Sequence, residues 1–366
     1  MTLTRLDKFP APYYGGKADA APLVWDALGD VAHYAEPFCG SLVTLLRRPH
    51  LANRTYYSET VNDIDGLLVN ALRALAYHPD ATADAASWYV SEADLHARHL
   101  ALVRWKASGE LERLMGDPRW CDPVMAGWWL WGVSCWIGGG FAAGDGPWIL
   151  GDDGRLTRRP GGGGVARQLP HLSGDGQGVN RPQAREPGAA ILSEPHPMTM
   201  PELRRWFAWL SARLRHVRIL NGDWSRLATS GALQTLPVRQ GKGVAGIFLD
   251  PPYGTDAARA EVYTHESFTM AAEVRDWCLA NGDNPRYRIV LAGFAGEGHE
   301  ALEAHGWRVQ EWFTAGFLKG GMGNQNTNGH QQHRERLWLS PHCLRPAVVA
   351  APAQGALWDE EVDDAA

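Results

Sequence analysis

Four consecutive residues, Asp250-Pro251-Pro252-Tyr253, follow directly on the apolar run Gly246-Ile247-Phe248-Leu249. The apolar run predicts a buried strand, which the prolines end because proline has a fixed φ and no backbone N–H. The Asp250 carboxylate and the Pro251 carbonyl can then accept hydrogen bonds from one NH₂ group, and Tyr253 offers a ring for stacking. The pattern favours a site for a planar aromatic amine, with Asp250, Pro251, Pro252 and Tyr253 as catalytic residues. The plainer alternative is an Asp-Pro turn at a strand end.

A second candidate segment, Glu36-Pro37-Phe38-Cys39-Gly40, lies between an expected strand at 31–35 and an expected helix at 42–46. In an open parallel sheet, a joint of this kind lines the ligand crevice at the carboxyl edge. Gly40 would let a ligand approach the backbone closely, and the start of the following helix favours a carboxylate. The segment is not a phosphate-binding P-loop, because the chain contains no Gly-x-x-x-x-Gly-Lys-Ser/Thr.

Two further segments point to a nucleoside cofactor. Asp63 follows the second expected strand, at 54–58, and an acid in this place commonly binds ribose hydroxyls. Asn62 or Asp63 would also serve as the N-cap of the next helix. Before the first strand, Pro12-Tyr13-Tyr14-Gly15-Gly16-Lys17 combines aromatic rings, a glycine hinge and a lysine. This segment is either a flap that brings Lys17 to an anionic group of the cofactor or a simple surface turn.

The order of the expected elements indicates an α/β protein. A helix with apolar residues from Leu67 to Leu75 follows the second strand, and a capping box at Thr199–Glu202 starts another helix. Further strands are expected at 217–220, 246–249 and 288–291, with a helix at 269–279. The segments 307–313 and 336–339 are expected to close the sheet as an antiparallel pair.

Residues 79–198 interrupt this alternation. Helical stretches at 91–115 and 124–137 precede a Gly/Pro/Arg-rich segment, 144–188, that has no periodicity. Part of the 17 tryptophans cluster at Trp128-Trp129-Leu130-Trp131 and Trp136. We therefore expect an inserted, mainly helical and irregular domain at 79–198. Residues 1–78 and 199–345 form the main domain, and residues 346–366 form an Ala/Pro-rich, acidic tail that we expect to be disordered.

The amino-acid composition excludes some classes of protein. Of the 366 residues, 45% are hydrophobic and 21% are charged, as in ordinary globular proteins. The net charge of −6 excludes a wholly basic nucleic-acid coat but not a local basic patch. The five cysteines are scattered, so we expect a reducing cytoplasm and no metal site. No apolar stretch is long enough for a membrane span.

Taken in order along the chain, these segments resemble the Dam-like DNA adenine-N6 methyltransferases, which use S-adenosylmethionine and carry the recognition domain inside the catalytic one. Pro12 to Lys17 is similar to the family's Gly-Gly-Lys motif, Glu36 to Gly40 to its cofactor turn, and Asn62-Asp63-Ile64 to its ribose motif. Asn221-Gly222-Asp223-Trp224 resembles its Asp-aromatic element, and Asp250 to Tyr253 resembles its catalytic motif.

The resemblance implies a Rossmann-like methyltransferase sheet, mostly parallel with an antiparallel last strand. It also implies S-adenosylmethionine as cofactor and double-stranded DNA as substrate, with the target adenine flipped out of the helix. The implied cofactor-binding residues are Tyr13, Lys17, Glu36, Pro37, Phe38, Gly40, Asp63, Asp223 and Asp250. One position departs from the family pattern: Leu42 stands where a second glycine of the cofactor turn is usual.

The arginines of the insert are candidate DNA contacts, among them Arg158, Arg159 and Arg167, although a solvated loop would carry the same residues. The segment Asp250 to Tyr253 also suits other aromatic amines, so RNA adenine or guanine methylation and cytosine-N4 methylation are alternatives. A non-catalytic DNA-binding relative is a further alternative, and Leu42 is the feature in its favour.

Overall fold

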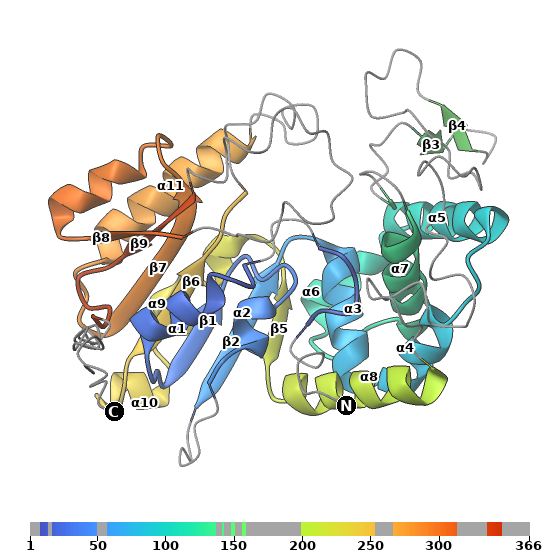
Figure 1. Cartoon of the computed structure of the whole chain (residues 1–366), viewed down its shortest axis with the longest axis horizontal. Helices are drawn as coiled ribbons and strands as arrows, with labels where there is room; N and C mark the ends of the chain where they lie inside the picture. Colours follow the sequence, from blue (N-terminus) through green and yellow to red (C-terminus); the bar gives the residue numbers. More distant parts are fainter. Residues whose placement is uncertain are drawn as a thin grey trace, which may run out of the picture.

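The computed structural model describes residues 8–13, 17–49, 57–136, 141–142, 148–150, 156–158, 199–252, 266–312 and 335–345. Its centre is a mixed sheet of seven strands in the order β5-β2-β1-β6-β7-β9-β8 (Figure 1). The strands are β1 (His33–Glu36), β2 (Ser58–Asp63), β5 (Arg218–Asn221), β6 (Ala245–Leu249), β7 (Tyr287–Phe294), β8 (Arg308–Glu311) and β9 (Glu335–Leu339).

The first five strands of this order are parallel to one another, and β9 is antiparallel to both β7 and β8. Counted along the chain, the parallel strands stand in the order 3-2-1-4-5, which is that of a Rossmann-like sheet. The expected α/β class, with a mostly parallel sheet and an antiparallel last strand, is confirmed. The direction of strand addition reverses between β1 and β6, so the ligand crevice of such a sheet is expected at their carboxyl ends.

Alternate residues of the central strands enter two different hydrophobic cores, because successive side chains of a strand point to opposite faces. Phe248 lies in the core that α1 (Ala21–Leu28) and α3 (Gly66–Tyr77) cover. Its neighbours Ile247 and Leu249 lie in the opposite core, which α11 (Glu266–Asn281) covers. Strand β6 is buried along its whole length, so the position that follows it, Asp250, is fixed by packing on both faces.

The helices of the segment 79–136 pack onto the same side of the sheet as α3. Helix α4 (Pro79–Ala86) contacts α7 (Pro123–Cys135) and α8 (Met200–Leu214), and α7 contacts α3. Buried residues of α4, α7 and α8 belong to one core cluster with those of α1 and α3. This part of the predicted insert therefore shares its core with the sheet domain.

The remaining helices of the described residues are α2 (Val43–Leu46), α5 (Glu92–Ala107), η2 (Glu110–Glu112), α6 (Arg113–Gly116), η5 (Trp224–Arg226), α9 (Ser230–Leu233), α10 (Leu236–Arg239) and η6 (His299–His305).

Two predictions of secondary structure are wrong. The second strand was expected to end at Ser58, but β2 runs over Ser58–Asp63, because its register with β1 pairs His33 with Ser58 and Glu36 with Val61. Residues 54–56 of the expected strand lie outside the described residues. Within the segment predicted to be irregular, β3 (Trp148–Leu150) pairs with β4 (Leu156–Arg158) as an antiparallel hairpin. Both hairpin strands carry residues that favour strands, and the five residues between them contain Asp153-Gly154, a turn signal that the sequence prediction overlooked.

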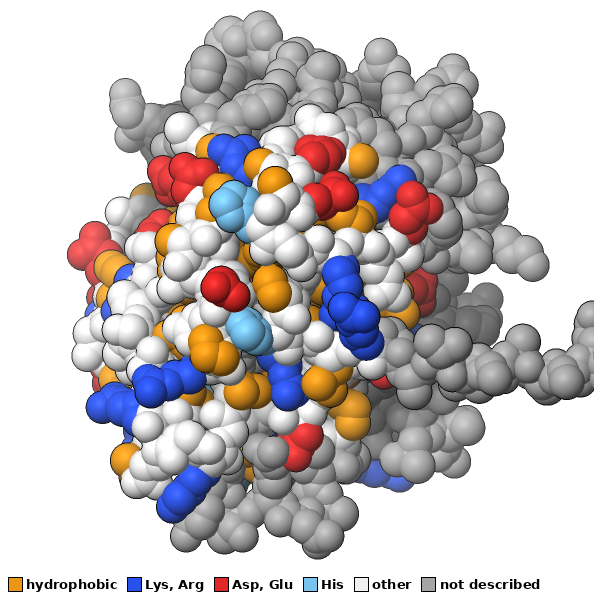
Figure 2. Space-filling view, turned by 90° about the vertical axis from the view of Figure 1, so that its left-hand side faces the viewer, with side chains coloured by type: hydrophobic (Ala, Val, Ile, Leu, Met, Phe, Trp, Pro, Cys, Tyr) orange, Lys and Arg blue, Asp and Glu red, His pale blue; other side chains and the backbone are white. Residues whose placement is uncertain are grey.

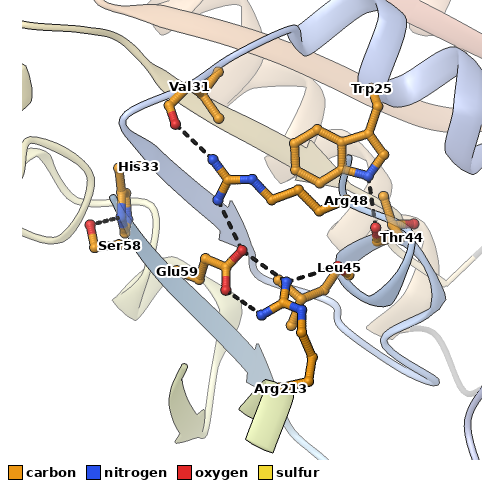
Figure 3. Close-up of polar contacts among 9 residues, drawn as sticks. All are labelled: Trp25, Val31, His33, Thr44, Leu45, Arg48, Ser58, Glu59 and Arg213. Atoms are coloured by element: carbon orange, nitrogen blue, oxygen red, sulfur yellow. Dashed lines mark hydrogen bonds and ion pairs between the residues drawn. The ribbon is translucent and has the colours of Figure 1, made fainter. Parts of the chain in front are cut away.

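A buried ionic cluster joins the C-terminal end of α2 to α8 (Figure 3). Glu59, only 4% exposed, accepts hydrogen bonds from Arg48 at 2.9 Å and from both terminal nitrogens of Arg213 at 2.6 and 2.9 Å. Arg48 also donates to the Val31 carbonyl at 2.8 Å, and Arg213 to the Leu45 carbonyl at 3.0 Å. One carboxylate thus holds two guanidinium groups from segments that flank the sheet.

Figure 2 shows the face formed by the α11 side of the molecule, where acidic and basic side chains are interspersed with hydrophobic ones. The described residues of this face form no patch of a single charge sign. In the part of the chain that the structure covers, no helix combines the length and the hydropathy that a membrane span needs. Among these residues there is also no cluster of three or more His, Cys, Asp or Glu side chains suited to a metal ion.

Candidate active site

Three acidic residues mark the carboxyl ends of three adjacent strands. Glu36 is the last residue of β1, Asp63 is the last residue of β2, and Asp250 follows the last residue of β6. Because β1 pairs with both β2 and β6 in parallel, all three residues lie at one edge of the sheet. The sequence segments identified as candidates therefore converge at the topological switch point.

Asp63 holds the turn that follows β1. Its Oδ2 accepts a hydrogen bond from the Gly40 amide at 3.0 Å, and its Oδ1 accepts one from the Asp65 amide at 2.9 Å. The cap of α3 is Asp65, whose side chain accepts from the amides of Leu67 and Leu68. The alternative in which Asn62 or Asp63 caps this helix is therefore wrong.

The side chains of Asn62 and Asn221 stabilise the backbone at the carboxyl end of β2. The Asn62 amide donates to the Pro37 carbonyl at 3.0 Å and to the Gly222 carbonyl at 2.9 Å. The Asn221 amide donates to the carbonyls of Asp63 and Ile64 at 3.0 and 3.2 Å. These side-chain bonds link the ends of β1, β2 and β5, so the backbone around Asp63 is fixed before any ligand binds.

A small pocket opens between the turn and the end of β6. Its lining includes Tyr13, Lys17, Glu36, Gly40 and Asp250. Lys17, only 4% exposed, places its Nζ 3.2 Å from Asp250 Oδ1. The Tyr13 ring lies against Gly40 so closely that a Cβ on residue 40 would come within 2.8 Å of Tyr13 Cε1. Only glycine fits at position 40 while Tyr13 keeps this place.

The pocket is acidic, because Glu36 and Asp250 line it, and burial changes the ionisation of Glu36 and of the nearby Asp63. Burial raises the pKa of Glu36 well above its usual range, and the neighbouring Asp250 and Asp63 raise it further. Burial raises the pKa of Asp63 to about 6, although the amides of Asp65 and Gly40 lower it. Acids with raised pKa values that lie together at one edge of a sheet are typical of functional sites.

Leu42 adopts a backbone conformation that glycine takes up most readily. Its φ and ψ are 57° and 12°, in the left-handed region, and its side chain is 1% exposed. A non-glycine residue there is strained by roughly 1–2 kcal/mol. The buried leucine offsets this strain by packing in the core, so the turn holds this conformation without a glycine at position 42.

We expect Leu42→Gly to be more stable than Leu42→Ala by about 1 kcal/mol in urea unfolding. Both variants lose the buried side chain, but only glycine relieves the strain at positive φ. Leu45, fully buried in α2, is the matched control: there alanine should be more stable than glycine, which is the usual helical order. Equal stabilities of the two Leu42 variants would mean that the turn stores no strain.

The other predicted site residues have varied surroundings. Phe38 stacks on Trp224 with ring centroids 5.8 Å apart. Asp223 is exposed and caps η5 by accepting from the Ser225 amide at 2.9 Å.

Pro251 is buried and Pro252 is exposed. Arg158 ends strand β4, whereas Tyr253, Arg159, Arg167 and the tail 346–366 lie outside the described residues.

Ile64 was named in the sequence only as part of the segment Asn62-Asp63-Ile64, and its surroundings make it a further candidate site residue. It directly follows Asp63 and is 73% exposed, although isoleucine is among the residues most often buried. An exposed apolar side chain beside the ribose candidate is suited to contact a nucleoside base. The available signal was one apolar residue within the otherwise polar run Asn62-Asp63-Ile64-Asp65.

Comparison with known proteins adds no assignment. The chain matches no protein-family model, and no curated protein is significantly similar to it.

Proposed function

We propose that the protein is an S-adenosylmethionine-dependent DNA methyltransferase that modifies N6 of a flipped adenine. The observation that supports it best is the convergence of Glu36, Asp63 and Asp250 at the switch point of a Rossmann-like sheet. A nucleoside crevice is expected there, and the Asp250-Pro251-Pro252 corner adds a pair of acceptors for an amine.

The described residues offer a buried carboxyl group, Glu36, to an ammonium of the cofactor, whose charge would lower the raised pKa of Glu36 and favour its ionised form. Glu36 is 2% exposed and lines the pocket, and its Oε2 accepts no hydrogen bond from the described residues. A buried polar atom of this kind calls for a donor from outside the protein. The enclosed space is about 30 Å³, which suits one small group such as an amine rather than a whole nucleoside.

Each residue then has a role that follows from its position. Glu36 would hold the cationic end of the cofactor, Asp63 its ribose hydroxyls, and Ile64 its base. S-adenosylmethionine supplies an electrophilic methyl group when bound. Gly40 leaves room for the Tyr13 ring, and Leu42 preserves the turn's shape. The left-handed backbone at Leu42 also weakens the case for a non-catalytic relative.

Asp250 and the Pro251 carbonyl would accept hydrogen bonds from the two N–H groups of the target amine. Such bonds localise the nitrogen lone pair, which is otherwise delocalised into the ring, and aim it for attack. No general base is needed, because the methylated ammonium is itself acidic. Catalysis would consist of positioning and fixed electrostatics. In a DNA duplex the amine lies inside the stack, so the base must flip out, and Tyr253 would stack on it.

We expect the affinity for S-adenosylmethionine to fall as the pH drops below about 6. The pKa of Asp63 is raised to about 6 in the free protein, so the carboxylate that accepts ribose hydroxyls is lost below that pH. If the ionised form is required, the affinity falls by up to about tenfold for each pH unit below 6. Calorimetric titrations between pH 5 and 7.5 measure this dependence.

The variant Asp63→Asn tests whether this pH dependence comes from Asp63 or from the neighbouring acids. The variant keeps an acceptor for the Gly40 amide but does not titrate, so its affinity should be weaker at pH 7.5 by about 1–3 kcal/mol. Its remaining pH dependence should be shallower than that of the wild type. A variant with wild-type affinity and the wild-type pH profile would show that Asp63 only supports the turn.

A further inference from the structure

A second pocket, like the acidic pocket, is lined by Tyr13. It has a volume of about 170 Å³, and its lining includes Lys8, Phe9, Tyr13, Ser41, Val43 and Arg47. Tyr13, Ser41 and Val43 also line the acidic pocket, so the two pockets share a wall. We refer to the second one as the basic pocket.

The charges of the two pockets are opposite. Glu36 and Asp250 line the acidic pocket together with one cation, Lys17. Lys8 and Arg47 line the basic pocket, and none of its described lining residues is a carboxylate. A ligand group that enters the basic pocket therefore meets two positive charges and the Ser41 hydroxyl, which is a set suited to an oxyanion.

The basic pocket is partly built before any ligand binds. A guanidinium nitrogen of Arg47 donates to the Ala18 carbonyl, which ties this side chain to the segment before α1. Phe9 packs edge-on against Tyr13 and Trp129, each with ring centroids 6.3 Å apart. Lys8 is exposed at the rim. The pocket thus has a fixed guanidinium, an apolar aromatic wall and a lysine that faces solvent.

We propose that the basic pocket binds a backbone phosphate of the nucleic-acid substrate, with the attached sugar against the Phe9–Tyr13 wall. This inference rests on the proposed function. A phosphate that approaches from solvent reaches Lys8 first, and the wall shared with the acidic pocket brings the neighbouring nucleotide to the pocket that contains Asp250. Positive charges that neutralise phosphates position a nucleic acid without reading its sequence.

Lys8→Ala tests the proposal through DNA binding measured over a range of salt concentrations. The variant should bind a duplex oligonucleotide several-fold more weakly, and its salt slope should be shallower by about 0.9, as expected for one lost phosphate contact. Lys8→Arg should restore both values. Lys242→Ala is the matched control, because Lys242 is exposed and precedes β6 at the amino edge of the sheet. Its affinity and slope should equal those of the wild type.

Two results would overturn the proposal. One is a Lys8→Ala variant with wild-type affinity and salt slope. The other is a variant that loses affinity for S-adenosylmethionine but not for DNA, which would assign the pocket to the cofactor's carboxylate.

A labelling experiment separates failure of this proposal from failure of the proposed function. Inorganic phosphate, used as the probe, should protect Lys8 but not Lys242 from acetylation by acetic anhydride, as measured by mass spectrometry. Protection in a protein that methylates no nucleic acid would support the anion site while the proposed function fails. Absence of protection in an active methyltransferase would reject the anion site alone.

Discussion

Asp250→Ala should lower the rate of methyl transfer by roughly 10² or more while cofactor affinity changes by less than about tenfold. The carboxylate is expected to bind the target amine more strongly as positive charge develops on it, and removal of one such preorganised group typically has an effect of this size. The structure adds a specific reason: Asp250 is held by Lys17, with Nζ 3.2 Å from Oδ1, so its acceptor is fixed in advance. Single-turnover rates and calorimetric titrations measure the two quantities separately.

Asp250→Asn is the matched variant for this experiment. Asparagine keeps an acceptor oxygen at nearly the same place but lacks the charge that pairs with Lys17, so its rate should lie between those of the wild type and Asp250→Ala. An Asp250→Ala variant whose rate stays within tenfold of the wild type would remove Asp250 from the catalytic site.

Glu59→Ala should lower the free energy of unfolding by about 3–5 kcal/mol. The substitution leaves Arg48 and Arg213 without the buried carboxylate that accepts three of their hydrogen bonds (Figure 3). An uncompensated charge in the interior is strongly destabilising, whereas the intact cluster itself contributes little. Urea unfolding monitored by tryptophan fluorescence measures the change.

The ion pair of Asp84 and Arg204 provides the control for this measurement. Their side chains lie 2.6 Å apart, but they are 53% and 52% exposed. Exposed pairs contribute about 0–1 kcal/mol, so Asp84→Ala should lie within that range. If both substitutions had equally small effects, the Glu59 cluster would be hydrated and would not fix α2 to α8.

The sequence predicted most of the sheet because strands buried on both faces are continuously apolar. Ala245–Leu249 is such a strand, and its proline-marked end lies where the pattern indicated. The capping box at Thr199 and Glu202 likewise predicted the start of α8, because its two reciprocal bonds are local in sequence. Features set by one strand or one helix end were thus accessible from the sequence.

Features that depend on contacts distant in sequence were not accessible. The local preference for a strand ends near Ser58, but β2 continues to Asp63 because its pairing with β1 decides the register. Asp65 rather than Asp63 caps α3, because the Asp63 carboxylate is engaged by the Gly40 amide. The conformation of Leu42 was also hidden, since a leucine in the left-handed region is stabilised by core packing that no local pattern reports.

The most direct test of the proposed function is to incubate the protein with methyl-labelled S-adenosylmethionine and either duplex DNA or RNA, and then to analyse the digested nucleosides by mass spectrometry. We expect labelled N6-methyladenine from DNA, and no label when Asp250→Ala replaces the wild type. Label in RNA or on cytosine N4 would contradict the assignment of the substrate. Absence of label from every nucleoside, with duplexes of diverse sequence, would contradict the central claim that the strand-end acids form a methyltransferase site.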